Sequence, residues 1–147
     1  MSKDIEPISI LIAEDDNDYI ILVKEALSEL KYDGSVKAFS NGEELINFLR
    51  TERIGEAGQA GRVLIILDLN MPKKDGHETL KEIRANSALR RLPVVVMTIS
   101  TDPKEVARCY SEGANSFITK PYDFDQLLST FTVFKEYWFE KVKIPLS

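Results

Sequence analysis

The stretch Val63-Leu64-Ile65-Ile66-Leu67-Asp68-Leu69-Asn70-Met71-Pro72 decides how the rest of the chain is interpreted. Five consecutive apolar residues, all β-branched or leucine, predict a strand buried on both faces, as in a parallel sheet. Pro72 cannot donate to a strand ladder, so the strand has ended by that point. Asp68 is therefore predicted at the carboxyl end of a central strand, where open α/β sheets place their ligand crevice. An ionised carboxylate beside so much apolar surface needs a partner.

The composition is that of a globular protein and restricts the classes of function. The chain has 147 residues, of which 44% are hydrophobic and 29% are charged. That length is enough to bury a core, and we expect a single domain over residues 1–147 with a short tail at 142–147. The net charge of −5 argues against nucleic-acid binding, which needs clustered Lys and Arg. No apolar run reaches the roughly 18 residues of a membrane span. Since the first residues also do not resemble a signal peptide, we expect a cytoplasmic protein.

Strand and helix patterns alternate five times along the chain. Strands are predicted at 8–13, 35–39, 63–67, 92–98 and 116–120. Capping signals follow each strand, and the last helix is expected to run to about Val142. The alternation predicts a doubly wound α/β fold, in which a five-stranded parallel sheet of flavodoxin-like order 2-1-3-4-5 carries helices on both faces. The glycine-rich stretch 55–61 matches neither common phosphate-loop pattern and is interpreted as a surface connector.

Polar side chains are predicted to converge at the carboxyl edge of this sheet. Four strands end in Glu14 and Asp15, in Asp68, in Thr98 and in Lys120. Three carboxylates this close repel one another unless a cation lies among them. An all-oxygen donor set favours Mg²⁺, while Lys120 supplies a positive charge and Thr98 a hydroxyl donor. These residues predict a phosphoryl site in which a carboxylate is the nucleophile.

The same residues resemble, over 8–141, the receiver domain of a two-component response regulator. The motifs that carry the resemblance are Glu14-Asp15, Asp68 followed by Asn70-Met71-Pro72, Thr98, Phe117 and Lys120-Pro121. The resemblance implies that a sensor histidine kinase phosphorylates Asp68. It also implies that Mg²⁺ is held by Glu14, Asp15, Asp68 and the backbone carbonyl of Asn70. Finally, it implies that Lys120 contacts the phosphoryl group and that the Lys120–Pro121 peptide is cis.

The resemblance further implies a switch. A phosphoryl group on Asp68 offers Thr98 a charged acceptor, and Phe117 then turns into the vacated space, which biases a two-state element. Ile99 follows Thr98 where the family usually has a smaller residue. We expect its side chain to narrow access to Asp68 and to prolong the life of the aspartyl phosphate.

The last predicted helix is more aromatic than a core-covering helix requires. The apolar residues of this helix form a broad stripe, which either covers the core and ends in an aromatic tail or is an association surface. We expect a homodimer whose surface includes Phe131, Phe134, Tyr137, Trp138 and Phe139. The tail from Tyr137 to Pro145 also resembles the stand-alone regulators of bacterial, especially cyanobacterial, phytochromes. That narrower resemblance implies a phytochrome as the sensor kinase; the downstream partner is not identified.

Two other functions stay open. The first is a Mg²⁺ phosphatase of the haloacid dehalogenase type. Asp68-Leu69-Asn70 differs at one position from the Asp-x-Asp motif of that class, but that class places its nucleophile after the first strand. The second is a receiver-fold binding module that is never phosphorylated. The leading interpretation is not an enzyme in the usual sense, since it catalyses only its own phosphorylation and dephosphorylation. His77 is interpreted as a surface residue and Cys109 as a packing thiol.

Overall fold

The structure is a computed structural model that describes residues 7–56 and 61–145 of the chain. Residues 57–60 of the predicted connector and both ends of the chain lie outside this part. The strands are β1 (Ser9–Ala13), β2 (Val36–Phe39), β3 (Val63–Leu67), β4 (Val94–Thr98) and β5 (Ser116–Thr119). The helices are α1 (Asn17–Glu29), α2 (Gly42–Thr51), α3 (Gly76–Ala85), α4 (Pro103–Ser111) and α5 (Phe124–Phe134), followed by the π-helical segment η2 (Lys135–Lys141).

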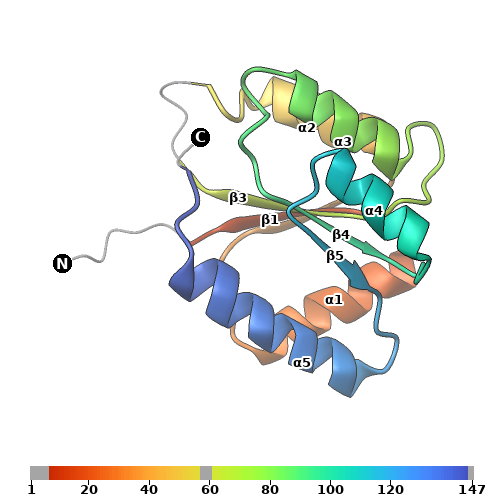
Figure 1. Cartoon of the computed structure of the whole chain (residues 1–147). Helices are drawn as coiled ribbons and strands as arrows, with labels where there is room; N and C mark the ends of the chain where they lie inside the picture. Colours follow the sequence, from red (N-terminus) through yellow and green to blue (C-terminus); the bar gives the residue numbers. More distant parts are fainter. Residues whose placement is uncertain (1–6, 57–60, 146–147) are drawn as a thin grey trace.

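The sheet is parallel with the order β2-β1-β3-β4-β5, as predicted. Helices α1 and α5 cover one face, and α2, α3 and α4 cover the other (Figure 1). Every residue of β3 is buried. Ile65 and Leu67 pack into the cluster beneath α2 and α3, whereas Leu64 and Ile66 pack into the cluster beneath α1 and α5. The unbroken apolar run thus reflects a strand with two buried faces.

Local capping fixes where α1, α2, α3 and α4 begin, whereas Asp123 at the start of α5 makes no side-chain cap hydrogen bond. The side chains of Asp16, Asn41 and Asp102 accept hydrogen bonds from backbone N–H groups in the first turns of α1, α2 and α4. Asp75 and Glu78 form a complete capping box at α3. Gly76, which follows Asp75, allows α3 to approach the backbone of Asp68 closely, because a Cβ at position 76 would lie 2.3 Å from the backbone oxygen of Asp68. The first turn of α3 therefore rests directly on the backbone of Asp68 and Leu69, just after β3.

The end of the chain corrects part of the predicted homodimer surface. Helical structure extends through η2 to Lys141, close to the expected end at Val142. Phe131 and Phe134, however, are 0% and 3% exposed and stack on each other with ring centroids 4.9 Å apart. They face inward because α5 packs against α1 and the sheet, so the assignment of these two rings to a surface was wrong. Tyr137 is exposed, and Trp138 and Phe139 are half-buried.

Among residues 7–56 and 61–145, none of the helices combines the length and the apolar character needed to span a lipid bilayer.

Candidate functional site

Three carboxylates converge at the carboxyl edge of the sheet. The register pairs Ala13 of β1 with Leu67 of β3, and the backbone N–H of Asp68 donates to the oxygen of Ala13 over 3.0 Å. This pairing brings Glu14 and Asp15 beside Asp68, with one oxygen of each carboxylate within 4.8 Å of the others. Glu14 and Asp68 are 3% and 5% exposed, whereas Asp15 is exposed. The predicted acidic cluster is therefore present.

Lys120 supplies the cation among these acids. It follows β5, and its Nζ lies 2.5 Å from Oε1 of Glu14 and 3.6 Å from Oδ2 of Asp68. Burial alone would lower the pKa of Lys120, but the hydrogen bond with Glu14 and the charge of Asp68 raise it above its ordinary value. The lysine is thus a buried ammonium that is charged at neutral pH. We call Lys120, Glu14 and Asp68 the Lys120 cluster.

The charges of this site do not balance. Burial raises the pKa of Glu14 to about 6; the hydrogen bond from Lys120 opposes this rise, and the charge of Asp68 adds to it. Three carboxylates face one ammonium, which leaves an excess of negative charge. All the donor atoms are oxygens, the ligands that a hard divalent cation such as Mg²⁺ prefers. The residues therefore fit the predicted metal.

Thr98 contributes an unsatisfied hydroxyl. It is the last residue of β4, is 0% exposed, and its Oγ1 is buried without a hydrogen-bond partner among the residues that the structure describes. A buried polar atom in this state costs about 1–3 kcal/mol. The backbone N–H of Lys120 donates to the carbonyl of Thr98 over 2.7 Å, which ties this residue to the Lys120 cluster. Thr98 can therefore donate to an acceptor that enters the site.

The other predicted site residues lie at the edges of this arrangement. Phe117 of β5 is half-buried and packs against the cluster beneath α2 and α3. The side chain of Ile99 is 59% exposed. Asn70 is exposed. The switching of Phe117, the effect of Ile99 on the phosphoryl group and the metal contact of the Asn70 carbonyl stay predictions.

The expectation of a cis peptide was wrong. No peptide bond in the described part of the chain is cis, so the Lys120–Pro121 bond is trans. Local sequence does not decide this geometry, because cis and trans forms before proline differ by only about 0.5–1 kcal/mol. In the trans arrangement the carbonyl of Pro121 accepts a hydrogen bond from Tyr19 Oη over 3.0 Å.

Sequence reasoning missed Tyr19 and misplaced His77. The ring of Tyr19 lies 4.7 Å from Nζ of Lys120, so its face adds a cation–π contact to that ammonium. An aromatic residue in the first turn after the acidic pair was the available signal, but the partner is about 100 residues away in sequence. His77 was expected at the surface and is 6% exposed, bound to two glutamates of distant sequence. Cys109 is buried, as expected for a packing thiol.

Comparison with known proteins agrees with this geometry. A family profile described as "Response regulator receiver domain" matches residues 10–132. The chain is 37% identical to the "Probable methanogenesis regulatory protein FilR2" of Methanothrix harundinacea, with 90% of this chain and 84% of that protein aligned. It is 36% identical to "Response regulator Rcp1" of Synechocystis, with 95% and 94% aligned.

Solved structures extend the similarity to three dimensions. The phosphorylated cyanobacterial phytochrome response regulator RcpA superposes with a TM-score of 0.82 at 34% identity, covering 95% of this chain and 99% of that chain. The Mn²⁺-bound form of Rcp1 gives 0.80 at 33% identity, with the same two coverages. The narrower resemblance to phytochrome regulators is thereby confirmed. A buried acidic cluster at the sheet edge, the order β2-β1-β3-β4-β5 and a matching family profile lead to one conclusion: the chain belongs to the response regulator receiver domains of two-component signalling.

Proposed function

We propose that Asp68 accepts a phosphoryl group from a sensor histidine kinase, in the cytoplasm, and that this modification changes an interaction surface. The observation that carries the proposal is the Lys120 cluster, together with the unsatisfied hydroxyl of Thr98, whose backbone is hydrogen-bonded to that of Lys120. A carboxylate oxygen of Asp68 forms the new P–O bond as the P–N bond of a phosphohistidine breaks. The leaving imidazole takes up a proton. Lys120 balances charge on the transferred group, and Thr98 donates to one of its oxygens.

The metal of this reaction would be Mg²⁺, held by Glu14, Asp15, Asp68 and the carbonyl of Asn70. The grouping of three carboxylate oxygens within 4.8 Å supports this assignment, as does the similarity to Rcp1, whose Mn²⁺-bound form has been solved. When bound, the ion would neutralise negative charge between the carboxylates and the phosphoryl oxygens.

The kinase partner would be a phytochrome. Support comes from RcpA, a cyanobacterial phytochrome response regulator that aligns with 95% of this chain. Phosphotransfer from a purified phytochrome kinase, compared with a kinase of another sensor class at equal concentration, tests the partner. Faster transfer from the unrelated kinase would contradict it.

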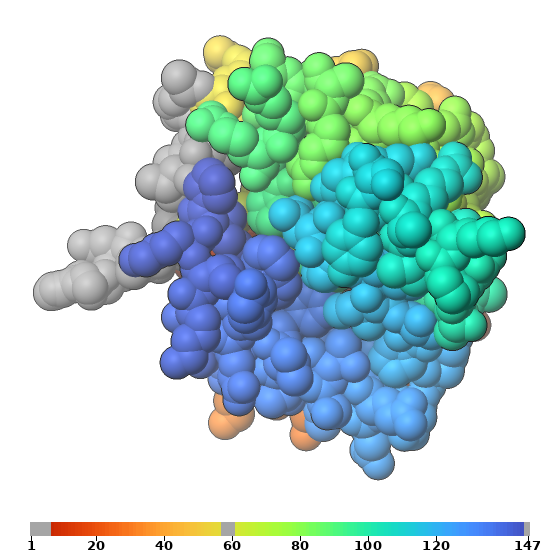
Figure 2. Space-filling model, viewed as in Figure 1, coloured from red at the N-terminus to blue at the C-terminus, as the bar shows by residue number. Residues whose placement is uncertain are grey.

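A homodimer would form through the exposed side of α5 and η2. An apolar groove of about 370 Å³ lies there, and its lining includes Ile118, Val133, Tyr137 and Trp138. Val133 and Tyr137 are 61% and 53% exposed. Exposure of this apolar surface to water is unfavourable, and a second copy of the chain would cover it. Figure 2 shows this side of the molecule, where α4, β5 and α5 face the viewer. Sizing the protein with and without beryllofluoride tests both the dimer and its dependence on phosphorylation.

Two readouts separate the proposal from its alternatives. Incubation with acetyl phosphate and Mg²⁺, followed by intact mass, is expected to add one phosphoryl group to the protein. A protein that gains no mass would be a receiver-fold binding module without phosphorylation. Multiple turnover of a small phosphate ester would instead indicate a phosphatase, for which the position of Asp68 after β3 gives little support.

The side chain of Ile99 is expected to slow hydrolysis of the aspartyl phosphate. The variant Ile99→Ala should lose the phosphoryl group faster than the wild-type protein, measured as the decay of the phosphorylated mass after removal of the phosphodonor. Ile21→Ala, a change at another exposed isoleucine, is the control. An unchanged hydrolysis rate in Ile99→Ala would contradict a steric role for this residue.

A further inference from the structure

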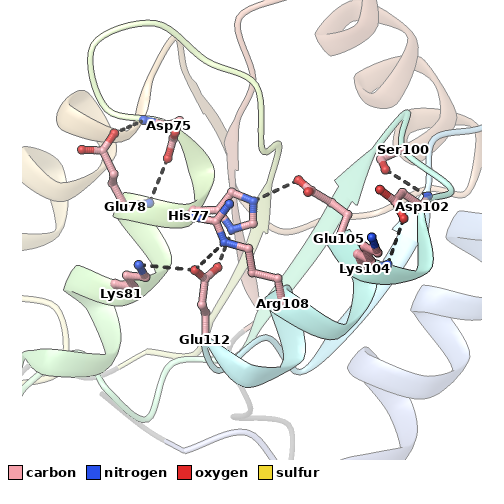
Figure 3. Close-up of polar contacts among 10 residues, drawn as sticks. All are labelled: Asp75, His77, Glu78, Lys81, Ser100, Asp102, Lys104, Glu105, Arg108 and Glu112. Atoms are coloured by element: carbon pink, nitrogen blue, oxygen red, sulfur yellow. Dashed lines mark hydrogen bonds and ion pairs between the residues drawn. The ribbon is translucent and has the colours of Figure 1, made fainter.

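The single histidine of the chain joins helix α3 to helix α4. His77 lies in the first turn of α3, and Figure 3 shows its ring between two glutamates. Nε2 lies 2.9 Å from Oε1 of Glu105 in the first turn of α4, and Nδ1 contacts Oε1 of Glu112 at the C-cap of that helix. The ring therefore contacts side chains that come from both ends of α4. We call His77, Glu105 and Glu112 the His77 cluster.

The ring can donate to both glutamates at once only if it carries two protons. A neutral imidazole carries one N–H, and an ionised carboxylate only accepts hydrogen bonds. Burial alone would raise the pKa of Glu112, but hydrogen bonds from His77 and Arg108 bring it below its ordinary value, so this carboxylate is ionised at neutral pH. A doubly protonated ring can donate to both glutamates at once. A neutral ring directs a lone pair at one of them.

The charged groups around the ring favour a proton over a metal ion. From α4, Arg108 lies 3.1 Å from Oε2 of Glu112, and from α3, Lys81 lies 3.5 Å from the same atom. The thiol of Cys109 is also close, but burial raises its pKa to about 11, with the charges of Glu105 and Glu112 adding to the rise. The sulfur is therefore a neutral thiol, and Glu112 already has two cationic partners, Lys81 and Arg108, besides the ring.

We propose that the His77 cluster is a pH-sensitive connection between α3 and α4. With a charged ring, both glutamates bind His77 and α4 is held against α3; with a neutral ring, one of the two contacts is lost and the connection weakens. Imidazole ordinarily changes its charge between about pH 5 and 8. The connection joins the helix that follows the Asp68 loop to the helix that follows Thr98. It goes beyond the proposed function, and it can be tested on unphosphorylated protein.

The protonation of the ring can be followed directly by NMR in the wild-type protein. Because the chain has one histidine, one set of imidazole signals reports on it. Over a pH titration, the ring nitrogen shifts distinguish a doubly protonated ring, which donates to both glutamates, from a singly protonated ring, which donates to one. The backbone amide shifts of Glu105, Arg108 and Glu112 should change in step with the ring. A ring that keeps one protonation state throughout, or α4 amides that do not follow it, would overturn the proposal.

Urea unfolding of variants gives a second test. The unfolding constant of the wild-type protein, divided by that of His77→Gln, should rise about tenfold between pH 5.5 and 8.5, as expected for loss of one charged hydrogen bond. Dividing by the variant removes the pH dependence of groups that do not interact with His77. Glu105→Gln should shrink this rise. Glu82→Gln, which changes an α3 carboxylate paired with Arg50 and Lys74, should leave it unchanged. An equal pH response of wild type and His77→Gln would contradict the role of the ring.

Discussion

The Lys120 cluster and the His77 cluster have a similar composition and different charged surroundings. Each places one basic side chain between two carboxylates. Around Lys120 a third carboxylate, Asp15, leaves the site negative, and Thr98 has an unsatisfied hydroxyl. Around His77 the additional neighbours, Lys81 and Arg108, are both cations.

The difference separates a site with an excess of negative charge from one whose carboxylates already have cationic partners. An excess of buried negative charge together with an unpaired donor is stabilised by a divalent cation and an anionic group. Carboxylates whose contacts are already satisfied have no such requirement, and the variable that remains is a proton. Similar residue types at two ends of one molecule can thus serve chemistry in one place and helix positioning in the other.

The largest expected effect is complete loss of phosphorylation in Asp68→Asn. Without a nucleophilic carboxylate oxygen, the protein should gain no mass from acetyl phosphate and Mg²⁺. Asp75→Asn is a matched control, because asparagine also caps a helix and Asp75 lies at the start of α3. A phosphorylated Asp68→Asn protein would show that Asp68 is not the only acceptor.

Removal of the ammonium should be the next largest effect. Lys120→Met leaves Glu14 and Asp68 buried without a cation, and we expect the free energy of unfolding to fall by about 3 kcal/mol without Mg²⁺. Added Mg²⁺ should recover part of the loss, since a ligand that binds the folded state stabilises it. Urea unfolding measures both, with the exposed Lys24→Met as control. Equal stability of Lys120→Met and wild type would mean that the two acids need no partner.

The affinity for Mg²⁺ should depend on pH through Glu14. Its pKa is raised from 4.5 to about 6, first by burial, so protons compete with the metal below pH 6. We expect the apparent affinity to rise by up to about tenfold per pH unit below this value and to level off above it. Without metal, the free energy of unfolding changes with pH in the opposite direction. Between pH 4.5 and 6 the folded state binds more protons at Glu14 than the unfolded state does, so the contribution of Glu14 to the free energy of unfolding falls as pH rises.

Calorimetric titration with Mg²⁺ from pH 5 to 8 measures this profile. Glu14→Gln should bind more weakly and lose the rise near pH 6. A wild-type affinity that does not change over this range would place the metal away from Glu14.

The smallest effect is expected at the rim of the His77 cluster. The side chain of Arg108 is 54% exposed, and exposed ion pairs contribute little because water screens them. Arg108→Ala should lower the free energy of unfolding by less than about 1 kcal/mol in urea, far less than Lys120→Met. A loss as large as that of Lys120→Met would show that the two clusters do not differ as described.

Local sequence patterns predicted the sheet and its polar edge. The run from Val63 to Leu67 indicated a doubly buried strand, and the alternation of elements indicated the parallel order that the structure has. Because parallel strands end at one edge, Asp68, Thr98 and Lys120 could be brought together from sequence alone. These predictions succeeded because each site residue ends or directly follows a strand that the local sequence predicts.

The predictions that failed depend on distant partners or on small energy differences. His77 is buried by glutamates 28 and 35 residues later in sequence. Phe131 and Phe134 belong to a stripe that is apolar on more than one side, and only the packing of α5 on α1 decides which side is buried. The trans geometry before Pro121 reflects a preference of about 1 kcal/mol. The absent partner of Thr98 Oγ1 also has no signature in sequence.

Gly76 has a consequence for any change that begins at Asp68. Because a Cβ at position 76 would lie 2.3 Å from the carbonyl oxygen of Asp68, the start of α3 cannot slide past this residue without displacing its main chain. His77, one residue further on, contacts Glu105 and Glu112 of the α4 region. A displacement of the Asp68 main chain would therefore reach α4 through two adjacent residues, Gly76 and His77.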